Sequence, residues 1–496
     1  MTGSGKARRP STKPWVDGLG SLPSTKKMAG RLLIFLLSLT AASAEVNAEA
    51  PRPHVVFLLA DDLGFGDVGW HGSEIRTPHL DALAASGTKL ERFYVQPVCS
   101  PTRASLMTGR YPMRYGLQVG VIRPHERRGL SLAERLLPQA LHDFGYATHM
   151  VGKWHLGFFE PAYLPTQRGF DHHYGHYCGA LDYFTHIRDG GFDWHRDTEP
   201  CHDEGYTTEL VGAEAARIIE NHDASRPLFL YVPFNAPHSP LQAPEAYLAK
   251  YENIKDKKRR AYAAMVTCED DQVGRILAAL DKKGLRDNTL VIFSSDNGGP
   301  TGLGATNGPL RAGKGTVYEG GTRVTACASW PGKIAPGSTV TEPLHMVDWF
   351  PTLLGLAGAS AESKLPLDGH DIWPVLTSGA KSPHEYLLHN ASPSGGALSM
   401  GDWKVVIHPQ ASPKGKGKGK NKQTGEERTG NGAESVELFN LLNDPGEKIN
   451  LATQEPAKTA ELLAKYRALA AEAVPPGNLE AAPGFKVPAI WGPFGQ

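Results

Sequence analysis

The sequence predicts an α/β fold in which helices cover both faces of a large β-sheet. Three near-continuous apolar runs, at 54–62, 228–234 and 289–299, have the composition of strands buried on both faces. Helical stretches separate these runs along the chain, and each run ends in a cluster of polar residues. Ligands bind beyond the carboxyl ends of the strands in such sheets, so we expect the polar clusters to share one crevice.

The helices between the strands are indicated by their end residues. The segment "TPHLDALAASG" (77–87) closes on Gly87, and "LPQALHDFG" has Pro138 at its start and Gly145 at its end. A longer amphipathic pattern runs from Lys257 to Gly284. These stretches predict helices that pack one apolar face on the sheet.

A smaller C-terminal α+β domain is predicted after "HMVDWFPTLLGLAG" (345–358). Beyond it the chain has short strands such as "DWKVVIH" (402–408) and a late helix from about 456 to 472. We therefore expect a catalytic domain at 50–370 and a C-terminal domain at 371–496.

Inside that domain, the lysine- and glycine-rich segment 413–432 predicts a flexible, solvated loop. The alternative is a tether for a polyanionic polysaccharide.

The N-terminal residues 1–44 are expected to be an extension followed by a secretory signal peptide. Residues 28–44, "MAGRLLIFLLSLTAASA", contain a basic residue, a short apolar run and an Ala-Ser-Ala ending. The run is too short to span a bilayer, so no membrane span is expected in the mature protein. A start at Met28 would give the leader an ordinary length. The alternative, a buried strand, has nothing upstream to pack against.

The charge balance of the 496 residues is even, with 52 basic and 52 acidic side chains. A net charge of zero provides no bulk attraction to nucleic acid or to membranes, so neither is expected as a partner. The subunit number stays open.

The five cysteines are an odd number for a secreted chain. Cys178 and Cys201 flank a loop-rich region and are candidates for a disulfide. Cys268 and Cys327 lie in apolar runs that are typical of buried, inert cysteines. Cys99 fits neither description, because it stands between two prolines where a helix would begin.

A metal site is predicted at the strand ends. Asp61, Asp62, Asp296 and Asn297 follow two of the apolar runs, and such neighbours are costly unless a positive charge lies among them. Hard oxygen ligands of this kind suit Ca²⁺ or Mg²⁺. Each short motif alone is more often a turn or a helix cap.

Five basic residues are expected around this metal: Arg103, Lys153, His155, His238 and Lys314. Together they would form a pocket for an anionic substrate, with an acid and a base available. For any single histidine a structural role is the alternative. The convergence of all five favours catalysis.

Two motifs identify a resemblance to a known family. The core formed by Cys99, Pro101 and Arg103 in "CSPTRASLMTGR", and the segment "GYATHMVGKWHLG" (145–157), resemble the two signatures of the type I sulfatases. The likeness extends from "PHVVFLLADDLGFGDVG" to the closing "IWGPFG". It implies an alkaline-phosphatase-like fold, with a large mixed β-sheet sandwiched by helices and a smaller C-terminal α+β domain.

Within this family the chain is most similar to the arylsulfatase B group, the N-acetylgalactosamine 4-sulfatases. The similar segments are "LPQALHDFGYATHMVGKWHLG", "LPTQRGFDHHYGH", "DYFTH" and "WGPF". The resemblance implies that the substrates are aryl sulfates and sulfated sugars such as N-acetylgalactosamine 4-sulfate.

The resemblance also implies that Cys99 is a precursor. In this family a formylglycine-generating enzyme oxidises the motif cysteine during secretion to formylglycine, an aldehyde that hydrates to a geminal diol. Pro101 suits a first helical turn, which would place the diol at a helix N-terminus, and Arg103 would hold it one turn further on. Ca²⁺, one per chain, would bind Asp61, Asp62, Asp296 and Asn297.

The implied reaction is a double displacement. One diol oxygen attacks sulfur, and the alcohol departs with a proton from His238 or Lys314. The second hydroxyl, deprotonated with help from His155, expels sulfate and restores the aldehyde. Lys153, Lys314 and Arg103 would hold the anionic oxygens.

Two other functions stay open at this point. One is a phosphodiesterase or phosphonate monoester hydrolase of the alkaline phosphatase superfamily. It is disfavoured because no second cluster of metal ligands is evident. The other is a catalytically dead, secreted glycan-binding homologue, which would have been free to lose Cys99, His155 or Lys314.

The location implied is the secretory pathway, with the mature protein extracellular or lysosomal. The glycosylation sequon at 390–392 is consistent with it.

Overall fold

The computed structural model of the chain describes residues 52–359, 365–393, 395–408, 435–477, 481 and 484–493. Residues Arg52–Gln496 form one compact unit. The segments 1–44 and 413–432 lie outside the described residues, so the signal peptide and the flexible loop stay predictions. The division at residue 370 also stays a prediction.

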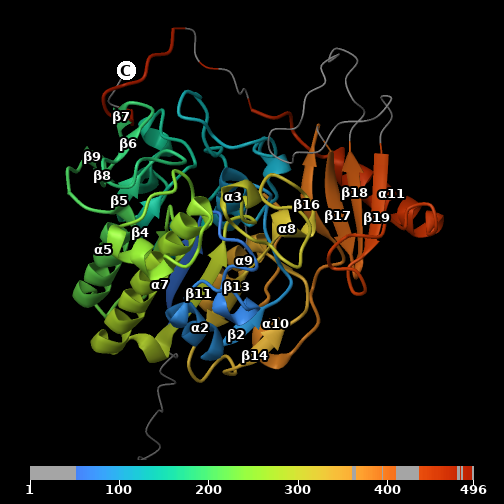
Figure 1. The fold of residues 1–496 in the computed structure, drawn as a ribbon, viewed down its shortest axis with the longest axis horizontal. Helices are drawn as coiled ribbons and strands as arrows, with labels where there is room; N and C mark the ends of the chain where they lie inside the picture. Colours follow the sequence, from blue (N-terminus) through green and yellow to red (C-terminus); the bar gives the residue numbers. More distant parts are fainter. Residues whose placement is uncertain are drawn as a thin grey trace, which may run out of the picture. The chain divides into compact units, whose positions relative to one another are not determined.

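A ten-stranded mixed sheet forms the centre of this unit (Figure 1). Five neighbouring strands, β11, β1, β10, β4 and β5, run parallel, whereas β13 and β8 pair antiparallel at either side of them. The large mixed sheet that the sequence analysis expected is therefore confirmed. In spatial order the strands are β14 (Ser338–Val340), β2 (Thr88–Leu90), β13 (Ala326–Ser329), β11 (Thr289–Ser295), β1 (His54–Ala60), β10 (Leu228–Pro233), β4 (Ala147–Lys153), β5 (His172–His176), β8 (His195–Arg196) and β9 (Glu199–Pro200).

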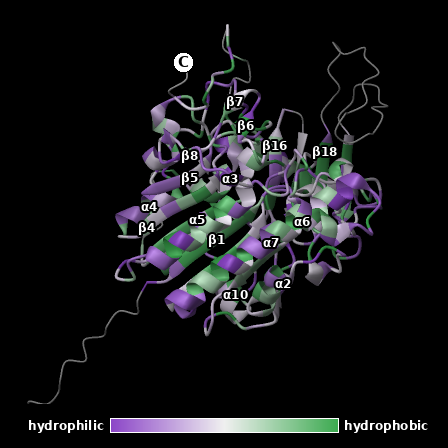
Figure 2. Cartoon of the chain, turned by 60° about the vertical axis from the view of Figure 1, so that its left-hand side comes forward, coloured by the Kyte–Doolittle hydropathy of each residue, from purple (hydrophilic) through white to green (hydrophobic). Residues whose placement is uncertain are grey.

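Helices cover both faces of this sheet. Along β1, Val55 and Phe57 belong to a core packed by α3 (Cys99–Thr108), α4 (Leu137–Asp143), α9 (Trp349–Leu356) and α10 (Trp373–Ser378). Val56 and Leu58 point to the opposite core, which α2 (Pro78–Ala85), α5 (Thr207–Asn221) and α7 (Lys257–Lys283) close. Strand residues alternate between the faces, so a strand buried on both faces is apolar throughout. Figure 2 shows this as a largely green β1 beside α5 and α7, which carry both green and purple.

The helices predicted from their end residues are present. In α7, the N-cap Asp256 accepts a hydrogen bond from the Arg259 backbone N–H at 2.8 Å, which satisfies one of the unpaired donors of the first turn. The helix ends at Gly284, whose φ of 74° lies in the left-handed region that glycine adopts without strain. The predicted span from Lys257 to Gly284 is therefore confirmed within one residue.

A four-stranded antiparallel sheet follows, formed by β16 (Leu387–Ser392), β17 (Gly395–Met400), β18 (Trp403–His408) and β19 (Ser435–Asn440). Helix α11 (Pro456–Ala470) packs on it through Leu462, Tyr466 and Leu469. The predicted strand at 402–408 and the late helix are thus confirmed.

Shorter elements connect these layers. The strands among them are β3 (Phe93–Tyr94), β12 (Arg323–Val324) and β15 (Leu344–His345) of a small sheet, and the hairpin β6 (Ile187–Arg188) and β7 (Gly191–Phe192). The short helices are α6 (Glu245–Leu248) and α8 (Glu319–Thr322). In the described residues the 3-10 turns are η1 (Gly69–His71), η2 (Pro112–Arg114), η3 (Pro161–Tyr163), η4 (Pro165–Gln167), η5 (Ala249–Tyr251), η6 (Arg286–Asn288), η7 (Thr301–Leu303) and η8 (Met346–Asp348).

All five cysteines are free thiols, so the suggested disulfide between Cys178 and Cys201 is wrong. The physical reason is their placement: Cys178 belongs to the core on the α3 face, and Cys201 packs against the core on the α7 face. Cys268 and Cys327 are buried, as predicted. Among the described residues, no helix has the length and apolar character that crossing a membrane requires.

Candidate active site

The pairing of β1 with β11 brings the predicted acidic residues together. Ala60 and Ser295 are register partners at the ends of these parallel strands, so Asp61 and Asp62 emerge beside Asp296 and Asn297. The Asp296 N–H donates to the Ala60 carbonyl at 3.0 Å, and the Asp62 N–H donates to Asp296 Oδ1 at 3.2 Å.

Arg103, one turn after Cys99 in α3, joins these acidic residues to that helix. Its Nη2 donates to Asp296 Oδ2 at 2.9 Å and to Asp61 Oδ2 at 3.2 Å, and its Nη1 donates to the Lys153 carbonyl at 2.9 Å. The side chain is fully buried, which is costly for a guanidinium unless carboxylates surround it. Because both carboxylates are held by one rigid group, α3 has a fixed position relative to the strand ends.

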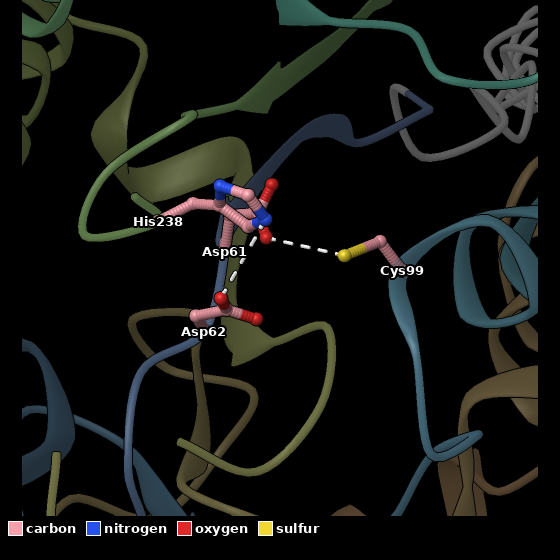
Figure 3. A group of neighbouring side chains, drawn as sticks. All are labelled: Asp61, Asp62, Cys99 and His238. Atoms are coloured by element: carbon pink, nitrogen blue, oxygen red, sulfur yellow. Dashed lines mark hydrogen bonds and ion pairs between the residues drawn. The ribbon is translucent and has the colours of Figure 1, made fainter. Parts of the chain in front are cut away.

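Cys99 is the first residue of α3 and lies at the centre of the site. Its thiol donates to Asp61 Oδ1 at 3.3 Å, as Figure 3 shows, and Lys314 Nζ lies 3.6 Å from Sγ. Burial, followed by the charges of Asp296 and Asp61, raises the pKa of the Cys99 thiol well above its usual range. The unmodified side chain is therefore a neutral thiol at neutral pH and a weak nucleophile.

Two lysines pair with the two aspartates that follow β1. Lys153, the last residue of β4, forms an ion pair with Asp61, and Lys314 Nζ lies 2.6 Å from Asp62 Oδ1. The loop of Lys314 is held in place where the Gly315 N–H donates to the Pro97 carbonyl at 2.8 Å, two residues before Cys99. Burial lowers the pKa of Lys314, but the charge of Asp62 outweighs it, so the net pKa is raised and the ammonium stays charged.

His238 lies on the loop after β10, with Nε2 3.7 Å from Asp62 Oδ2 (Figure 3). Its Nδ1 is 2.6 Å from the Ser239 carbonyl. A carbonyl only accepts, so Nδ1 carries the proton. Burial and then the charge of Lys314 lower the pKa of His238 to about 4, so in this arrangement the imidazole is neutral at pH 7.

One ring nitrogen of His155 is hydrogen-bonded to the protein, and the other has no partner among the described residues. Nε2 lies 3.0 Å from the Ile122 carbonyl and must donate to it, which leaves Nδ1 as the unprotonated nitrogen of a neutral ring. Nδ1 is buried and has no hydrogen-bond partner among the described residues. Burial, followed by the charges of Lys153 and Arg103, lowers the pKa of His155 well below its usual range. The ring is thus a neutral group with an available lone pair.

The carboxylates are unequal in their electrostatics. Burial raises the pKa of Asp61, but the charges of Lys153, Arg103 and Lys314 outweigh it and the net pKa is lowered. The pKa of Asp296 shifts in the opposite direction, because burial and the charge of Asp61 raise it to about 6. Like charges at this spacing repel each other, and an added cation would relieve that repulsion.

The donor set fits a hard divalent cation. Asp61, Asp62 and Asp296 supply carboxylate oxygens, and Asn297 Oδ1 is a buried acceptor with no partner among the described residues. A carbonyl oxygen left without a donor in a buried site is costly, and a cation would satisfy it. The ligating atoms of Asp61, Asp62, Cys99 and His238 also lie within 4.8 Å of one another. Oxygen-rich surroundings of this kind suit Ca²⁺.

All ten residues singled out from the sequence therefore belong to one constellation. The contacts above link eight of them directly, and Asn297 is the ninth, because its Nδ2 donates to Asp62 Oδ1 at 2.7 Å. The tenth, His155, joins through Ser100, whose hydroxyl donates to the His155 carbonyl at 3.0 Å and accepts from the Ile122 N–H at 3.1 Å. Asp62 and His155 have positive φ values, 74° and 60°, which non-glycine residues adopt at a cost in energy.

Sequence reasoning missed three supporting residues. The Ile122 carbonyl orients His155. Gly179 leaves room for the same ring, because a Cβ there would lie 2.4 Å from His155 Nε2. The Tyr183 hydroxyl contacts the carbonyls of Asn235 and His238 at 2.5 and 2.7 Å. The segment "DYFTH" contains Tyr183, but nothing in its spacing indicates this contact.

A family model described as Sulfatase matches residues 53–359, more than half of the chain. These residues include every member of the constellation. The chain belongs to the sulfatase family. Its sheet and helices accordingly form the alkaline-phosphatase-like arrangement that the two motifs implied.

Relatives within the sulfatases are similar along most of this chain. Arylsulfatase J of Mus musculus is 38% identical over 90% of this chain and 81% of its own length. Arylsulfatase A of Homo sapiens is 35% identical over 87% of this chain and 90% of its own. A crystal structure of Ps i-CgsB in complex with k-i-k-neocarrahexaose superimposes with a TM-score of 0.77 at 33% identity, covering 86% of this chain and 94% of the other. Sulfate ester hydrolysis is thus the activity of the family to which this chain belongs.

Proposed function

We propose that this sulfatase hydrolyses sulfate monoesters through a formylglycine formed from Cys99, with one bound Ca²⁺. The observation that carries the proposal is the placement of Cys99: it begins α3, points at Asp61 and Lys314, and is buried among charged groups. An unmodified thiol would be a poor nucleophile at this position, because its raised pKa keeps it neutral. A hydrated aldehyde at this position would supply two hydroxyls, one for attack and one for release of sulfate.

Asp61, Asp62, Asp296 and Asn297 would hold the Ca²⁺, which supplies Lewis-acid polarisation and positive charge to the pocket when bound. Without a metal ion the charges in the pocket are balanced, because three carboxylates face the three cations Arg103, Lys153 and Lys314. A divalent ion therefore leaves an excess of positive charge, which favours an anionic sulfate ester.

The remaining steps are assigned to the side chains of the chain itself. Arg103, Lys153 and Lys314 hold anionic oxygens in a buried site where their charges act strongly. His155 Nδ1, with its free lone pair, is the base that accepts a proton from the residue 99 side chain. Lys314, whose ammonium stays charged, donates the proton to the departing alcohol, or His238 does so from Nε2 once that nitrogen has been protonated; both lie against Asp62.

The proposed substrates are aryl sulfates and sulfated sugars, with N-acetylgalactosamine 4-sulfate as the first candidate. The formylglycine-generating enzyme is the proposed partner during secretion, and the secretory pathway, ending outside the cell or in lysosomes, is the proposed location. Both follow from the need to modify Cys99.

The direct test compares two aryl esters. We expect turnover of 4-nitrocatechol sulfate to exceed that of bis(4-nitrophenyl) phosphate by at least about 100-fold in kcat/KM, a difference of about 2.7 kcal/mol. Preference for the phosphodiester would support the phosphonate and phosphodiester hydrolases instead. Absence of turnover with both esters, in protein whose residue 99 is modified, would support a dead glycan-binding homologue.

Gly179→Ala tests the role of His155. The added methyl group would lie 2.4 Å from Nε2 and 2.5 Å from Cε1, so the ring must move and its bond to the Ile122 carbonyl is lost. We expect kcat to fall about 10- to 100-fold, because a displacement of this size at a reacting group is costly. Gly302→Ala is the control, since a Cβ there meets nothing within 4 Å. Equal kcat values in the two variants would remove His155 from the mechanism.

Tyr183→Phe tests whether the His238 loop is positioned by a hydroxyl. The variant keeps the buried ring but loses the contacts to the Asn235 and His238 carbonyls. We expect kcat to fall about 10-fold, the loss for about one hydrogen bond, with an unchanged KM and a shifted pH profile of kcat. Tyr146→Phe is the matched control, because its hydroxyl donates to the Pro53 carbonyl at the far end of β1. A pH profile that stays fixed would mean that Tyr183 is only structural.

A further inference from the structure

Three segments lie next to the proposed catalytic histidines, and we call them together the rim: the loop 121–128, the segment 182–192 and the C-terminal strap 484–493. The loop touches His155 through the Ile122 carbonyl. The segment 182–192 touches the His238 loop through the Tyr183 hydroxyl. The rim therefore borders the site on the side of both histidines.

The strap is fastened to the segment 182–192. The Phe192 N–H donates to the Ala489 carbonyl at 2.8 Å, and the Trp491 N–H donates to the Phe192 carbonyl at 2.9 Å. The Trp491 indole, itself buried, donates to the Arg188 carbonyl at 2.7 Å. These bonds fix the strap, so the side chains that it exposes have defined positions.

The strap also reaches the loop 121–128. The Phe485 ring lies 6.2 Å from the His125 ring and stacks on Trp491 at the same centroid distance. Upstream, the Gly477 N–H donates to the Gly116 carbonyl at 3.0 Å. The three segments thus form one continuous surface.

This surface exposes apolar side chains that a soluble protein normally buries. Phe184, Ile187, Phe485 and Val487 are 47%, 37%, 37% and 46% exposed. They make up half of the large apolar side chains exposed among the described residues. Apolar surface gathered in one region in this way marks a binding site more often than chance exposure.

Basic side chains accompany the apolar ones. Arg123 and Lys486 are exposed, and the Arg127 guanidinium lies 3.9 Å from the centroid of the Phe159 ring. Arg128, by contrast, is paired with Glu126 at 2.6 Å inside the loop. The exposed charge of the loop and strap is therefore positive.

We propose that the rim binds the sugar units that flank the sulfated unit in a polyanionic glycan. This inference rests on the proposed function and narrows its substrate class from small sulfate esters to polymeric ones. Phe184 and Phe485 offer ring faces against which the C–H face of a sugar packs, while Arg123 and Lys486 meet the sulfate or carboxylate groups of neighbouring units. A small aryl sulfate would reach the catalytic residues without touching the rim.

Charge favours this occupant over a protein partner or a second copy of the chain. A self-contact would bring Arg123 and Lys486 of each copy toward like charges, whereas a sulfated polysaccharide supplies the opposite charge at every repeat. The aromatic faces would pack on the sugar rings, and the cations would pair with their anionic groups.

The test measures binding and turnover separately on the full chain. Binding is measured by affinity electrophoresis of the Cys99→Ala protein in gels that contain dermatan sulfate, chondroitin 4-sulfate or ι-carrageenan. The rim variant adds Arg123→Gln, Phe485→Ala and Lys486→Gln, and the control adds Leu442→Ala and Lys282→Gln, two exposed positions outside the rim. Segment 413–432 is the same in all of them, so differences report the rim.

We expect at least one polysaccharide to bind, and the rim variant to bind it at least 10-fold more weakly than the control. With Cys99 intact, the rim variant should keep kcat/KM for 4-nitrocatechol sulfate within twofold of wild type. Equal binding by rim and control variants, or no binding to any of the three polysaccharides, would overturn the inference. So would self-association that light scattering detects in wild type and not in the rim variant. If the wild-type protein does not hydrolyse the aryl sulfate at all, the proposed function itself would be refuted.

Discussion

Cys99→Ala is expected to abolish sulfatase turnover, with kcat reduced about 10⁴-fold or more while the fold is retained. Nucleophile removal has effects of this size in enzymes that form covalent intermediates. The side chain lies in a buried pocket between Asp61 and Lys314, and its replacement by a methyl group removes little volume, so the packing is disturbed little. The thermal midpoint should therefore stay within a few degrees of wild type, which separates a chemical defect from unfolding.

Cys99→Ser sharpens the same prediction. Serine presents a single hydroxyl, so attack on sulfur would release one equivalent of alcohol and leave a sulfate ester with no second hydroxyl to expel it. With 4-nitrocatechol sulfate we expect at most one product per active site, followed by no further turnover. Sustained multiple turnover by this variant would exclude the diol mechanism.

Mass spectrometry of the peptide that contains residue 99 completes the test. In wild-type protein secreted from cells that have the modifying enzyme, CH₂SH should be replaced by CHO. Cys201→Ser is the control, because Cys201 is half-buried on a different part of the fold and should leave both the aldehyde and the activity unchanged. An unmodified thiol at residue 99 in fully active protein would contradict the proposal.

The strand ends could be predicted because local sequence determines them. The run before Asp61 and the run before Asp296 are apolar throughout, which is typical of strands buried on both faces. Parallel strands in one sheet end at the same edge, so the prediction of shared position needed no knowledge of strand order. The register pair of Ala60 and Ser295 then brings the two polar clusters side by side.

The supporting contacts could not be predicted because they join loops that are distant in sequence. Ile122 and His155 are 33 residues apart, and Tyr183 and His238 are 55 residues apart. In both pairs a backbone carbonyl is the acceptor, and any residue type provides a carbonyl. The need for glycine at position 179 becomes evident only when the position of the His155 ring is known.

The disulfide prediction failed for a related reason. Cys178 and Cys201 are 23 residues apart in a region of short strands, and their spacing is compatible with a bridge. The sheet edge formed by β5 and β8 intervenes, so that each thiol packs on a different face. Spacing along the chain gives no information about which face a cysteine joins.

Removal of Ca²⁺ should inactivate the enzyme and lower its thermal stability. Exhaustive chelation is expected to reduce turnover of 4-nitrocatechol sulfate to below about 1%, because the pocket then has three carboxylates against three cations and lacks the excess positive charge that favours the substrate sulfate. Added Ca²⁺ should restore activity. A ligand that binds only the folded state at 100 times its Kd adds about 2.7 kcal/mol of stability. Differential scanning fluorimetry should therefore show a higher unfolding midpoint with Ca²⁺.

Asn297→Ala locates the ion through binding rather than turnover. The variant removes Oδ1, the buried oxygen without a partner, together with the Nδ2 bond to Asp62 at 2.7 Å. We expect Kd for Ca²⁺ to rise about 10- to 100-fold, about 1.4 to 2.7 kcal/mol, so the stabilising effect of a fixed Ca²⁺ concentration should shrink. Asn221→Ala on α5 is the control, since its Nδ2 donates only to a carbonyl of its own helix and should leave the Ca²⁺ response unchanged. If both variants keep the wild-type response, the ion binds elsewhere and the strand-end carboxylates serve only to neutralise Arg103 and the two lysines.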